Sequence, residues 1–588
     1  MPQALQRALT LLQWGKLAEA EHLYQQILKV DPAQFDALHL LGIIKVRQGN
    51  NQQGVNFMSE ALRIRPNAAE THSNLGIALR NLNRLDDALM SYDKALAIKP
   101  DYPEALNNRG NALLGLNRYD EAIASYDKAI AIKPDYAEAL DHRGAILLTQ
   151  GKIEEAISCC RRALAIEPDN HSIHSNLIFA LNFDPAATAA EHQAERARWD
   201  EQHAKRFAAA VPPHTNHPDP DRRLRVGYVS SHFRDQAATY AFGGVLLCHD
   251  RKWFDVTCYS DTLREDDITA RFRSSVSKWH HTMGLSDDEL ADLIRADGID
   301  ILVDLVGHMT GHRLVVFARK PAPVQVTAWG EPTGTGLKTM DYLLADPVLV
   351  TGAERGLLAE RVVDLPNFLG YWTPDPLPEP GALPARAQGY VTFGSFNRIS
   401  KVLDPVLRSW AAVLRALPEA HLVLKDRALA DFNQRARILA ILADEGVTAE
   451  RVMLLGQSDR AAHYAAYQAI DIALDPFPHG GGMTTLDALW MGVPVVTWPG
   501  RTISSRLAAA NLTALGLTDF IATDPETYVQ LAVVKATNLD ALARLRASLR
   551  QRVADSAFGD SIRYTRAVEA AYRLMWQRWC ADAKNRLA

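Results

Sequence analysis

The chain has 588 residues, a length that predicts three or four domains. Hydrophobic residues make up 47% of it and charged residues 23%, which is an ordinary globular composition, and the formal net charge is −5. Basic and acidic residues are interspersed, so the basic stripe that nucleic-acid binding requires is missing and we expect no nucleic-acid partner. The five cysteines show no CxxC pair and no zinc-type spacing with histidine, which predicts reduced thiols and neither a disulfide framework nor a metal site.

The first residues, MPQALQRALTLLQWGKLAEAE, have the pattern of an amphipathic helix. They lack the uninterrupted apolar segment of a signal peptide. No apolar run approaches the roughly 18 residues of a membrane span. We therefore expect a cytoplasmic protein without a membrane partner.

A period of 34 residues runs through positions 1–185. Glycine, alanine and proline each recur with this step, at Gly42, Gly76, Gly110 and Gly144, at Ala61, Ala95, Ala129 and Ala163, and at Pro32, Pro66, Pro100, Pro134 and Pro168. Glycine inside one helix and proline just after the next is the signature of tetratricopeptide repeats. The pattern predicts an α-solenoid of five helix–turn–helix units, capped by a further helix at about 170–182.

Polar side chains follow the same 34-residue step along the first helices of the repeats. Asn74, Asn108 and Asn176 lie on this lattice, with His142 on the step between the last two. Stacked repeats present a concave surface, and amide side chains offer both hydrogen-bond donors and acceptors to a peptide backbone. We expect these residues to line a groove for a protein or peptide partner, although they also fit a plain solvated helix face.

Residues 186–222 are expected to join the repeats to the rest of the chain. Positions 184–207 have the pattern of one charged helix, and the proline-rich segment 211–223 that follows indicates an irregular linker. Asp219-Pro220-Asp221 matches the Asp-x-Asp pattern of metal-dependent sugar transferases. Because it lies among prolines, turn chemistry explains it better than metal binding.

The C-terminal part alternates short β-branched runs with helical segments. A proline-rich break at 374–384 divides it into two candidate domains, 223–385 and 386–588. Runs without polar alternation predict parallel strands covered on both faces, and hence two doubly wound, Rossmann-like α/β domains with a cleft between them. The expected strands are LRVGYVS, DVTCYS, DILVDLVG and VQVTAW in the first domain, and YVTFGSF, HLVLKD, RVMLLG, DIALDPF and VPVVTW in the second. A long C-terminal helix, RYTRAVEAAYRLMWQRW, could pack back across the joint.

A glycine-rich turn offers the clearest ligand signal in this part. The chain has neither a GxGxxG after a first strand nor a GxxxxGK[ST] motif, which argues against classical NAD and P-loop ATP binding. In DPFPHGGGMTTLDALW (475–490), glycines follow an expected strand and open a helix. Free backbone N–H groups at such a helix start bind anions, which favours a diphosphate site.

Taken together, these segments resemble the O-GlcNAc transferase family in its bacterial and SPINDLY-like branch, over nearly the whole chain. Five motifs carry the resemblance: RVGYVSSHF (225–233), DGIDILVDLVGHMTGHRLVVFARKPAPVQV (297–326), TGLKTMDYLLAD (335–346), FGSFNRISKVLDPVL (393–407) and GGGMTTLDALWMGVPVVTWPG (480–500).

The resemblance implies a GT-B fold, in which the two Rossmann-like domains form the catalytic region. It also implies an inverting, metal-independent transfer of a sugar, most simply GlcNAc from UDP-GlcNAc, to Ser or Thr hydroxyls of proteins. No cofactor besides the nucleotide-sugar substrate is expected. The repeat groove would present the acceptor, and a homodimer is compatible with such repeats.

The resemblance assigns residues to the donor site. Lys401 matches the lysine that meets the donor diphosphate and neutralises charge on the departing nucleotide. Arg398 matches a neighbouring position that approaches the diphosphate. His463 matches the histidine that packs on the base, and Arg460 falls at a polar position on the nucleotide side.

The glycine-rich turn and the first expected domain supply further candidates. Gly481, Gly482, Met483 and Thr484 match the phosphate-binding helix start in the family. Asp487 matches a ribose contact, although it could also cap the helix. His308, in LVGHMTG, matches a family residue near the cleft.

Three positions depart from the family pattern. Gln236 stands where the family has a histidine, a candidate base that titrates near neutrality, and an amide cannot take the acceptor proton. The proton would then pass to Asp297 through water, to the donor phosphate, or to no protein group. Met483 replaces a threonine of the phosphate turn, and Glu331 replaces an aromatic residue.

Three hypotheses therefore stay open. The chain is a protein O-GlcNAc transferase, or the same fold uses another donor such as GDP-fucose, or a catalytically impaired domain serves as a scaffold behind a repeat adaptor. UDP binding compared with GDP binding separates the first two hypotheses, and absence of turnover with retained partner binding would support the third.

Overall fold

The computed structural model describes residues 2–208, 211–373 and 377–587. They group into two compact units, one formed by residues 1–147 and 158–167 and the other by residues 148–157 and 168–588. The repeat pattern predicted a boundary near residue 185. The structure instead groups the segment from Pro168 onward with the second unit, because the helix expected to cap the repeats packs against the joining helix.

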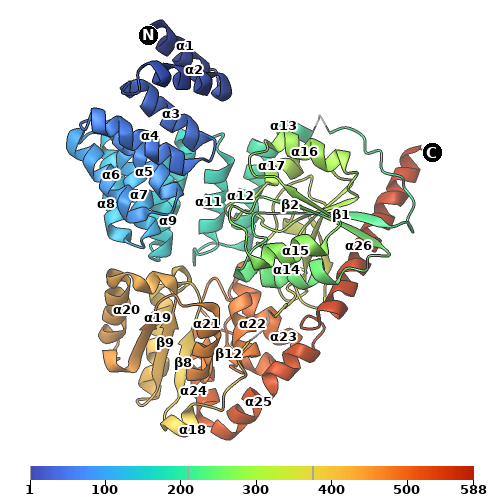
Figure 1. Ribbon diagram of the computed structural model, residues 1–588. Helices are drawn as coiled ribbons and strands as arrows, with labels where there is room; N and C mark the ends of the chain where they lie inside the picture. Colours follow the sequence, from blue (N-terminus) through green and yellow to red (C-terminus); the bar gives the residue numbers. More distant parts are fainter. Residues whose placement is uncertain (1, 209–210, 374–376, 588) are drawn as a thin grey trace. The chain divides into compact units, whose positions relative to one another are not determined.

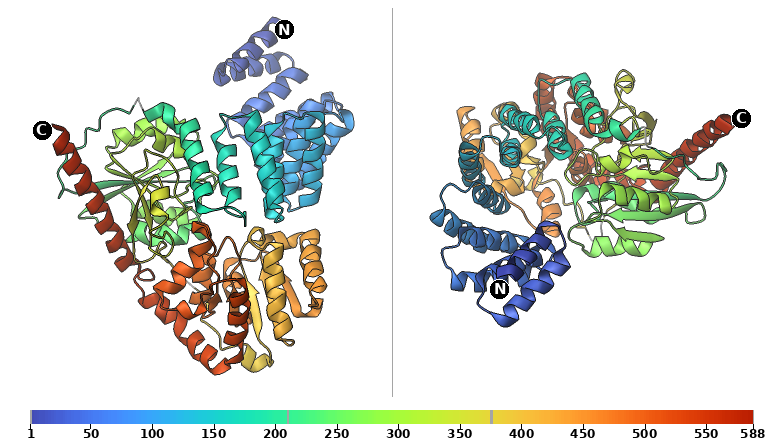
Figure 2. Two further views of the ribbon diagram at one scale, coloured as in Figure 1. Left: turned by 180° about the vertical axis from the view of Figure 1, so that it is seen from behind. Right: turned by 90° about the horizontal axis from the view of Figure 1, so that it is seen from above.

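The repeats form ten helices in successive pairs (Figures 1 and 2). They are α1 Pro2–Gln13, α2 Leu17–Val30, α3 Phe35–Arg47, α4 Asn51–Ile64, α5 Ala69–Asn81, α6 Leu85–Ile98, α7 Pro103–Gly115, α8 Tyr119–Ile132, α9 Ala137–Thr149 and α10 Ile153–Ile166. Each proline of the 34-residue period follows the end of a second helix, because proline cannot continue one. The five predicted repeats are therefore confirmed.

The repeated glycines allow the two helices of a repeat to approach closely. A Cβ at Gly76 would lie only 2.5 Å from the ring of Tyr92, and one at Gly110 only 2.4 Å from the ring of Tyr126. Both tyrosines are fully buried, and so is Ala95. The third and fourth repeats thus bury an aromatic ring of the second helix against a glycine of the first, and in the second repeat Met58 packs against Gly42 in the same way, which explains the period at the level of packing.

Four helical segments precede the first sheet in the second unit. They are α11 His171–Leu181, α12 Ala189–Trp199, a short π-helix Asp200–Ala204 and α13 Lys205–Ala208. The single helix predicted over 184–207 starts later than expected, because Thr188 caps α12 through its hydroxyl while Glu191 bonds back to the Thr188 backbone. In the linker, Asp221 N donates to Asp219 Oδ1 at 3.0 Å, so the Asp-Pro-Asp sequence forms a local turn as predicted.

The first sheet has seven parallel strands in the order β3-β2-β1-β4-β5-β6-β7. They are β1 Leu224–Ser230, β2 Phe254–Ser260, β3 Lys278–His281, β4 Ile301–Asp304, β5 Val324–Thr327, β6 Tyr342–Ala345 and β7 Arg361–Asp364. Its helices are α14 Ala237–Cys248, α15 Asp267–Ser275, α16 Asp287–Ala296 and α17 Leu314–Ala318. Figure 1 shows α14 and α15 on one side of the sheet and α16 and α17 on the other.

The second sheet has five parallel strands in the order β10-β9-β8-β11-β12. They are β8 Thr392–Ser395, β9 His421–Lys425, β10 Val452–Leu455, β11 Ile472–Leu474 and β12 Val495–Val496. The helices around it are α18 Ala385–Gln388, α19 Asp404–Ala416, α20 Phe432–Asp444, α21 Arg460–Ala466, α22 Met483–Trp490, α23 Leu507–Ala514, α24 Pro525–Thr537 and α25 Leu539–Asp555. Both sheets are doubly wound, so this part of the fold prediction is confirmed.

The last helix, α26 Ser561–Leu587, returns to the first sheet. It packs on α14, and Trp576 Nε1 donates to the carbonyl of Asp219 at 2.8 Å. The chain therefore crosses from the second sheet back to the first, and the C-terminal helix contacts the linker that precedes β1.

All nine strands predicted from the sequence are present. Strands β3, β6 and β7 were not predicted, and β3 and β7 lack a continuous apolar run. No helix in the described part of the chain is both long and apolar enough to cross a membrane.

Candidate functional site

A cleft of about 190 Å³ lies where both sheets end. Its walls come from the loops after β1, β4 and β5 of the first sheet, from the loops after β8, β11 and β12 of the second, and from Phe179 and Phe183 at the end of α11. Strand order reverses between β1 and β4 and between β8 and β11, and such reversals at the carboxyl ends of strands are where doubly wound sheets bind ligands. The predicted cleft between the two domains is thus present.

The glycine-rich turn joins β11 to α22 and faces this cleft. Gly481 N donates to Asp475 Oδ1 at 2.7 Å, and the other oxygen of Asp475 accepts from Thr497 Oγ1 at 2.7 Å. Gly482, Met483 and Thr484 line the cleft, and α22 begins at Met483. The first N–H groups of a helix have no acceptor within it, so the turn offers donors to an anion, as the sequence predicted.

Lys401 lies beside this turn and also lines the cleft. Its Nζ donates to the carbonyl of Gly480 at 2.7 Å. Burial, followed by repulsion from Arg398, lowers the pKa of Lys401, and the nearby Asp475 opposes this change. A bound diphosphate would therefore relieve an unfavourable concentration of positive charge, which suits the role predicted for Lys401.

Arg398 and His463 lie on the same side of the cleft. Arg398 is solvent-exposed and lines the cleft next to Asn397, whose Oδ1 accepts from Thr484 Oγ1 at 2.8 Å. The His463 ring lies 5.8 Å from that of Phe396 and 5.7 Å from that of Tyr467. Burial lowers its pKa to about 4, so the imidazole is neutral near pH 7 and suited to packing on a base.

Arg460 connects the second sheet to the first. Its guanidinium lies over the ring of Tyr240, which belongs to α14, at 4.5 Å from the ring centroid. It also lies 3.8 Å from the carboxylate of Asp235, just before α14. Its Nε and Nη2 are buried and have no hydrogen-bond partner in the described residues. Unpaired guanidinium donors of this kind are compatible with the predicted nucleotide contact.

Asp487 is held inside α22 by two tyrosines. Its Oδ1 accepts from Tyr371 and from Tyr464 at 2.9 Å each, and its side chain is 9% exposed. Burial raises its pKa to about 6, against the opposing effect of the two hydroxyls. Asp487 is thus not a helix cap, and a ribose contact would have to use the oxygen left free by the tyrosines.

Gln236 precedes α14 in the loop that follows β1. Its Nε2 reaches the carbonyl of His232 at 3.4 Å, and its neighbours Ala237 and Ala238 line the cleft. Position 236 therefore lies next to the cleft lining, with an amide that cannot act as a base, and its catalytic role stays a prediction.

His308 lies directly behind the cleft wall but does not line the cleft itself. It is 1% exposed, its Nδ1 bonds Ser175 Oγ at 3.0 Å, and its Nε2 bonds the carbonyl of Thr335 at 2.8 Å. Burial lowers its pKa far below the ordinary value. With both nitrogens engaged, His308 anchors the loop after β4 to α11, and its neighbour Met309 lines the cleft instead.

Asp297 also lies away from the cleft. Asp297 caps the C-terminal end of α16 and so precedes strand β4, whereas the strand-flanking residues of the cleft lie in loops that come after the strands. Its carboxylate accepts from Tyr259 at 2.8 Å, Lys278 at 2.8 Å and His280 at 2.9 Å. These partners hold its pKa below the usual value despite burial and engage both carboxylate oxygens, and the water-mediated proton transfer considered for Asp297 stays a prediction.

Glu331, which replaces an aromatic residue of the family pattern, forms a buried ion pair. Its Oε1 accepts from Arg196 at 2.7 Å and from Asn182 at 2.8 Å, and its Oε2 from the backbone N–H of His308 at 3.1 Å. Arg196 on α12 has no exposed surface and also donates to the carbonyl of Gly334 at 3.0 Å. The α11–α12 segment thereby holds the loop after β5, part of which lines the cleft.

The sequence analysis missed several residues of the cleft wall. Phe183 and His479 line it with their rings stacked, 4.8 Å apart and at 6° to one another. Trp329 lines it with a φ of 60°, a left-handed conformation that is uncommon outside glycine. Asn397 and Asp475 support the glycine-rich turn. Phe183 after the repeats and His479 before the glycines are visible in the sequence, but no sequence pattern indicates that the two rings are in contact.

The polar residues predicted on the repeat lattice lie on first helices of successive repeats. Asn74 is on α5 and Asn108 on α7, two helices in mutual contact, and both side chains are partly buried. His142 on α9 bonds Asn107 Oδ1 through Nδ1 at 3.1 Å, so it is partly engaged. Asn176 lies on α11, which belongs to the second unit. Their role in binding an acceptor stays a prediction.

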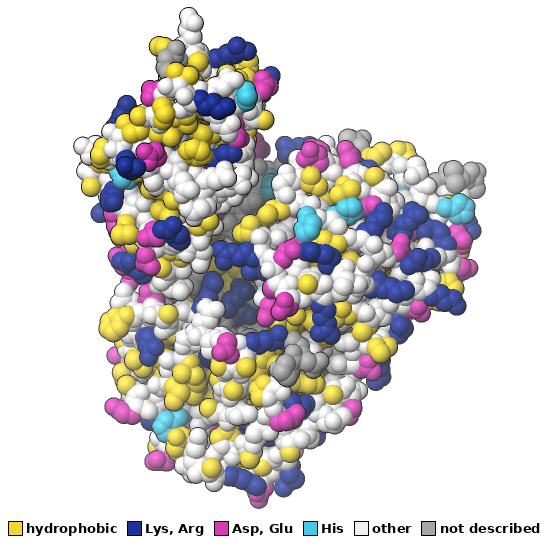
Figure 3. All heavy atoms as spheres, in the orientation of Figure 1, with side chains coloured by type: hydrophobic (Ala, Val, Ile, Leu, Met, Phe, Trp, Pro, Cys, Tyr) yellow, Lys and Arg dark blue, Asp and Glu magenta, His cyan; other side chains and the backbone are white. Residues whose placement is uncertain are grey.

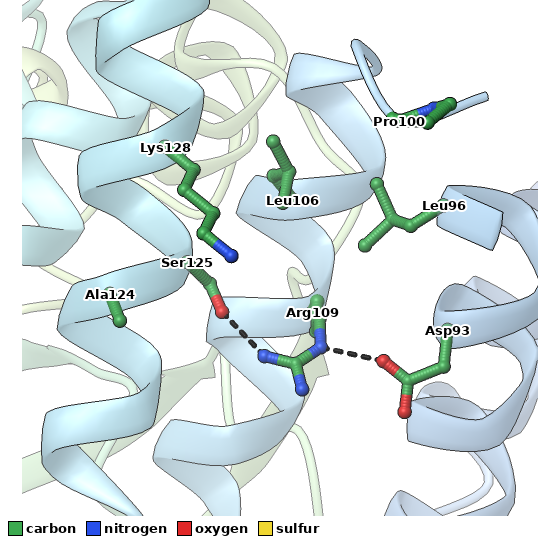
Figure 4. Close-up of a pocket in the computed structure, with 8 residues that line it drawn as sticks. All are labelled: Asp93, Leu96, Pro100, Leu106, Arg109, Ala124, Ser125 and Lys128. Carbon is green, nitrogen blue, oxygen red and sulfur yellow. Dashed lines mark hydrogen bonds and ion pairs between the residues drawn. The ribbon is translucent and has the colours of Figure 1, made fainter.

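A second cavity, of about 330 Å³, lies among α6, α7 and α8 of the repeats (Figure 4). Within it, Arg109 donates to Asp93 at 2.7 Å and to Ser125 at 2.8 Å. One repeat later, Arg143 donates to Asp127 at 2.7 Å. The recurrence indicates a brace between neighbouring repeats. Basic, acidic and hydrophobic side chains are interspersed on the repeat face that Figure 3 shows.

Metal binding has no obvious location in this structure. Across the ranges 2–208, 211–373 and 377–587, His, Cys, Asp and Glu side chains form no group of three or more that could hold an ion.

Comparison with family models gives two matches. The model of glycosyl transferase family 41 matches residues 167–367 and 382–568. A tetratricopeptide-repeat model matches four overlapping segments from residue 5 to residue 171. Together they cover the repeats and both sheets.

Individual relatives give the same assignment. The chain is 34% identical to a Solanum lycopersicum protein named probable UDP-N-acetylglucosamine–peptide N-acetylglucosaminyltransferase SPINDLY, over 69% of this chain and 44% of the relative. It is 37% identical to the Oryza sativa protein of that name, over 70% and 45%. It thus spans less than half the length of these relatives. A solved mutant of the Thermobaculum terrenum O-GlcNAc transferase matches 88% of this chain and 98% of its own, with 36% identity and a TM-score of 0.81.

Proposed function

Since the chain belongs to glycosyl transferase family 41, we propose that it is an inverting glycosyltransferase that modifies proteins. The donor in this proposal is UDP-GlcNAc, and the acceptors are Ser or Thr hydroxyls of polypeptides presented by the repeats. The names of its relatives support this donor, and the matched tetratricopeptide repeats support a polypeptide acceptor.

One observation carries the proposal. Lys401 lies in the cleft with its Nζ 2.7 Å from the carbonyl of Gly480, next to the donor-rich start of α22. A lysine and a row of free N–H groups that converge at the carboxyl ends of parallel strands suit a diphosphate better than an uncharged ligand.

In the proposed reaction, an acceptor oxygen attacks the anomeric carbon of the donor sugar from the side opposite the diphosphate. The bond between that carbon and the phosphate oxygen breaks, and its electron pair leaves with the nucleoside diphosphate. The hydroxyl proton passes to the departing diphosphate, because Gln236 cannot accept it and Asp297 lies outside the cleft. Lys401 and the N–H groups of α22 neutralise the charge that develops on the leaving group.

We also propose that this reaction needs no metal ion. Metal-dependent sugar transferases use a divalent cation to stabilise the departing diphosphate, and here a lysine and a helix N-terminus are suited to the same task. Transfer that continues unchanged in excess EDTA would support this part of the proposal.

The test is transfer of HexNAc from UDP-GlcNAc to protein or peptide acceptors, detected by the mass shift on Ser or Thr. Lys401→Ala is expected to lower turnover by about 100-fold or more, the usual effect of removing a group that stabilises developing charge. Lys535→Ala is the matched control, since that lysine lies on α24, pairs with Asp519 and does not line the cleft. Equal turnover in native protein and Lys401→Ala would refute the proposed role of Lys401.

Two other outcomes would change the function itself. Transfer from GDP-fucose but not from UDP-GlcNAc would identify the same fold as a protein O-fucosyltransferase. No transfer from either donor, together with retained binding of polypeptides by the repeats, would make the chain a scaffold. Gln236 and Met483 are the departures that motivate the scaffold alternative.

A further inference from the structure

One wall of the cleft carries an imidazole that the proposed reaction does not use. His479 lies between β11 and the glycine-rich turn, and its ring stacks on that of Phe183 at 4.8 Å and 6°. Phe183 is 1% exposed, and its neighbour Asn182 donates to Glu331 at 2.8 Å. The ring on which His479 rests is therefore fixed by the α11 segment, which restricts the imidazole to one orientation.

The imidazole keeps hydrogen-bonding capacity that the protein does not satisfy. Its Nδ1 is buried and has no hydrogen-bond partner in the described ranges. Burial, with repulsion from Lys401 and Arg398, lowers the pKa of His479 far below its ordinary value, while a hydrogen bond to the backbone of Asn182 acts the other way and leaves Nδ1 as the open nitrogen. The ring is therefore neutral near pH 7, and a neutral imidazole has one donor and one acceptor nitrogen.

The position of His479 relative to the diphosphate site limits what it can contact. The next residue, Gly480, accepts the hydrogen bond from Lys401, so His479 lies one residue from the place where the diphosphate is proposed. The remaining cleft wall is mainly apolar, with Phe179, Met309 and Leu369 among its residues. In such a pocket the few polar groups set the orientation of the ligand.

Glu331 is another hydrogen-bond acceptor in this wall, but its carboxylate already accepts hydrogen bonds from the protein. It accepts from Arg196, Asn182, Thr333 and the backbone of His308. Arg398 and Lys401 also line the cleft but offer only donors, so Nδ1 of His479 adds a hydrogen-bond acceptor for the part of the donor beyond the diphosphate.

We propose that His479 is a specificity-determining residue that hydrogen-bonds the sugar of the donor, through a hydroxyl or an amide substituent, while Phe183 holds its ring in place. This inference rests on the proposed function, because it requires a nucleotide sugar in the cleft. It adds that discrimination between donor sugars depends on position 479, whereas affinity for the nucleotide diphosphate depends on Lys401.

Two substitutions separate the nitrogens of His479 from its shape. His479→Phe keeps a ring against Phe183 and removes both nitrogens, whereas His479→Asn keeps a hydrogen-bonding group and removes the ring. His281→Phe is the matched control, because that histidine lies on β3 with a side chain that is 59% exposed. Thermal melting of all variants shows whether each is folded before binding is measured.

The experiment compares the dissociation constants of UDP and UDP-GlcNAc, and of GDP and GDP-fucose, by calorimetry. For the donor that binds, His479→Phe is expected to raise the dissociation constant of the nucleotide sugar by about 3- to 10-fold, the effect of one lost hydrogen bond. The dissociation constant of the nucleoside diphosphate without its sugar should rise by less than about twofold. His479→Asn should retain part of the sugar-dependent affinity, and His281→Phe should match native protein.

The outcomes distinguish this inference from the function on which it rests. Equal weakening of diphosphate and nucleotide sugar, or no weakening of either in both His479 variants, would overturn the role of His479 and leave the proposed function standing. Absence of binding of every nucleotide and nucleotide sugar to native protein would overturn the proposed function and this inference with it.

Discussion

The buried pair of Arg196 and Glu331 gives a prediction whose size follows from the structure. Arg196→Met removes a guanidinium with no exposed surface and leaves the Glu331 carboxylate, 6% exposed, without its cation. It also leaves the carbonyls of His192 and Gly334 without this donor, at 3.2 and 3.0 Å. Removing one partner of a buried ion pair costs about 3–5 kcal/mol, because an uncompensated charge stays behind.

For a cooperative region of roughly 200 residues, that loss corresponds to a fall in melting temperature of roughly 6–20 °C. The loop after β5 would also lose an anchor, so the affinity for the nucleotide sugar should fall. Arg196→Met combined with Glu331→Gln removes the uncompensated charge and should recover about half of the lost stability. A simple loss of packing at Arg196 would not be reversed by Glu331→Gln, so recovery of stability in the double variant identifies the uncompensated charge as the cause.

The assay is differential scanning fluorimetry with urea titration of the same variants. Arg546→Met is the matched control, since Arg546 is 2% exposed and donates to the carbonyls of Gly381 and Ile470 at 2.9 and 2.8 Å, with no carboxylate among its hydrogen-bond partners. It should cost less than Arg196→Met. The reasoning fails if Arg196→Met lies within about 1 kcal/mol of native protein, or if Glu331→Gln gives no recovery.

Three further predictions follow from packing and charge. Nucleotide binding should be accompanied by proton uptake at pH values between 7 and 10.5, because a bound diphosphate raises the lowered pKa of Lys401 towards its ordinary value of 10.5. Calorimetry in buffers of different ionisation enthalpy measures the number of protons taken up. Lys401→Met should lose most of this proton uptake. Gly76→Val should cost about 1–3 kcal/mol, since its Cβ would meet the ring of Tyr92, and partial proteolysis should show early cleavage in the repeats but not in the sheets. The folded pKa of Asp487 is raised from 3.8 to about 6, so its charged form destabilises the fold and native stability falls as pH rises through this window. Asp487→Asn should therefore be more stable than native protein by on the order of 2 kcal/mol at pH 8 in urea titrations, with little difference at pH 3.

The fold was largely predictable because local patterns were strong. The 34-residue period requires a small residue where two helices cross, as at Gly76 and Tyr92, and such a requirement leaves a visible trace in the sequence. The continuous apolar strands were equally clear, since parallel sheets are covered on both faces. The boundary near residue 185 was wrong because α11 follows the repeat pattern while its contacts are with α12 and the first sheet.

The site was predictable where a motif supplies the chemistry by itself. Lys401 and the turn at Gly481–Thr484 lie together in the cleft, as expected from a helix start after a strand. The surroundings of His308 and Asp297 were not predictable, because their side chains are engaged by partners that no motif reveals, Ser175 in one case and Tyr259 in the other.

The sequence by itself determined the repeats, the two doubly wound sheets and the glycine-rich turn between a strand and a helix, since each depends on residues close together in the chain. Only the tertiary structure decided which side chains are free to act. Arg196 and Glu331 lie 135 residues apart in the chain, and Phe183 and His479 lie 296 residues apart. Whether such groups are paired, stacked or open to a ligand depends on the three-dimensional packing that brings distant segments into contact.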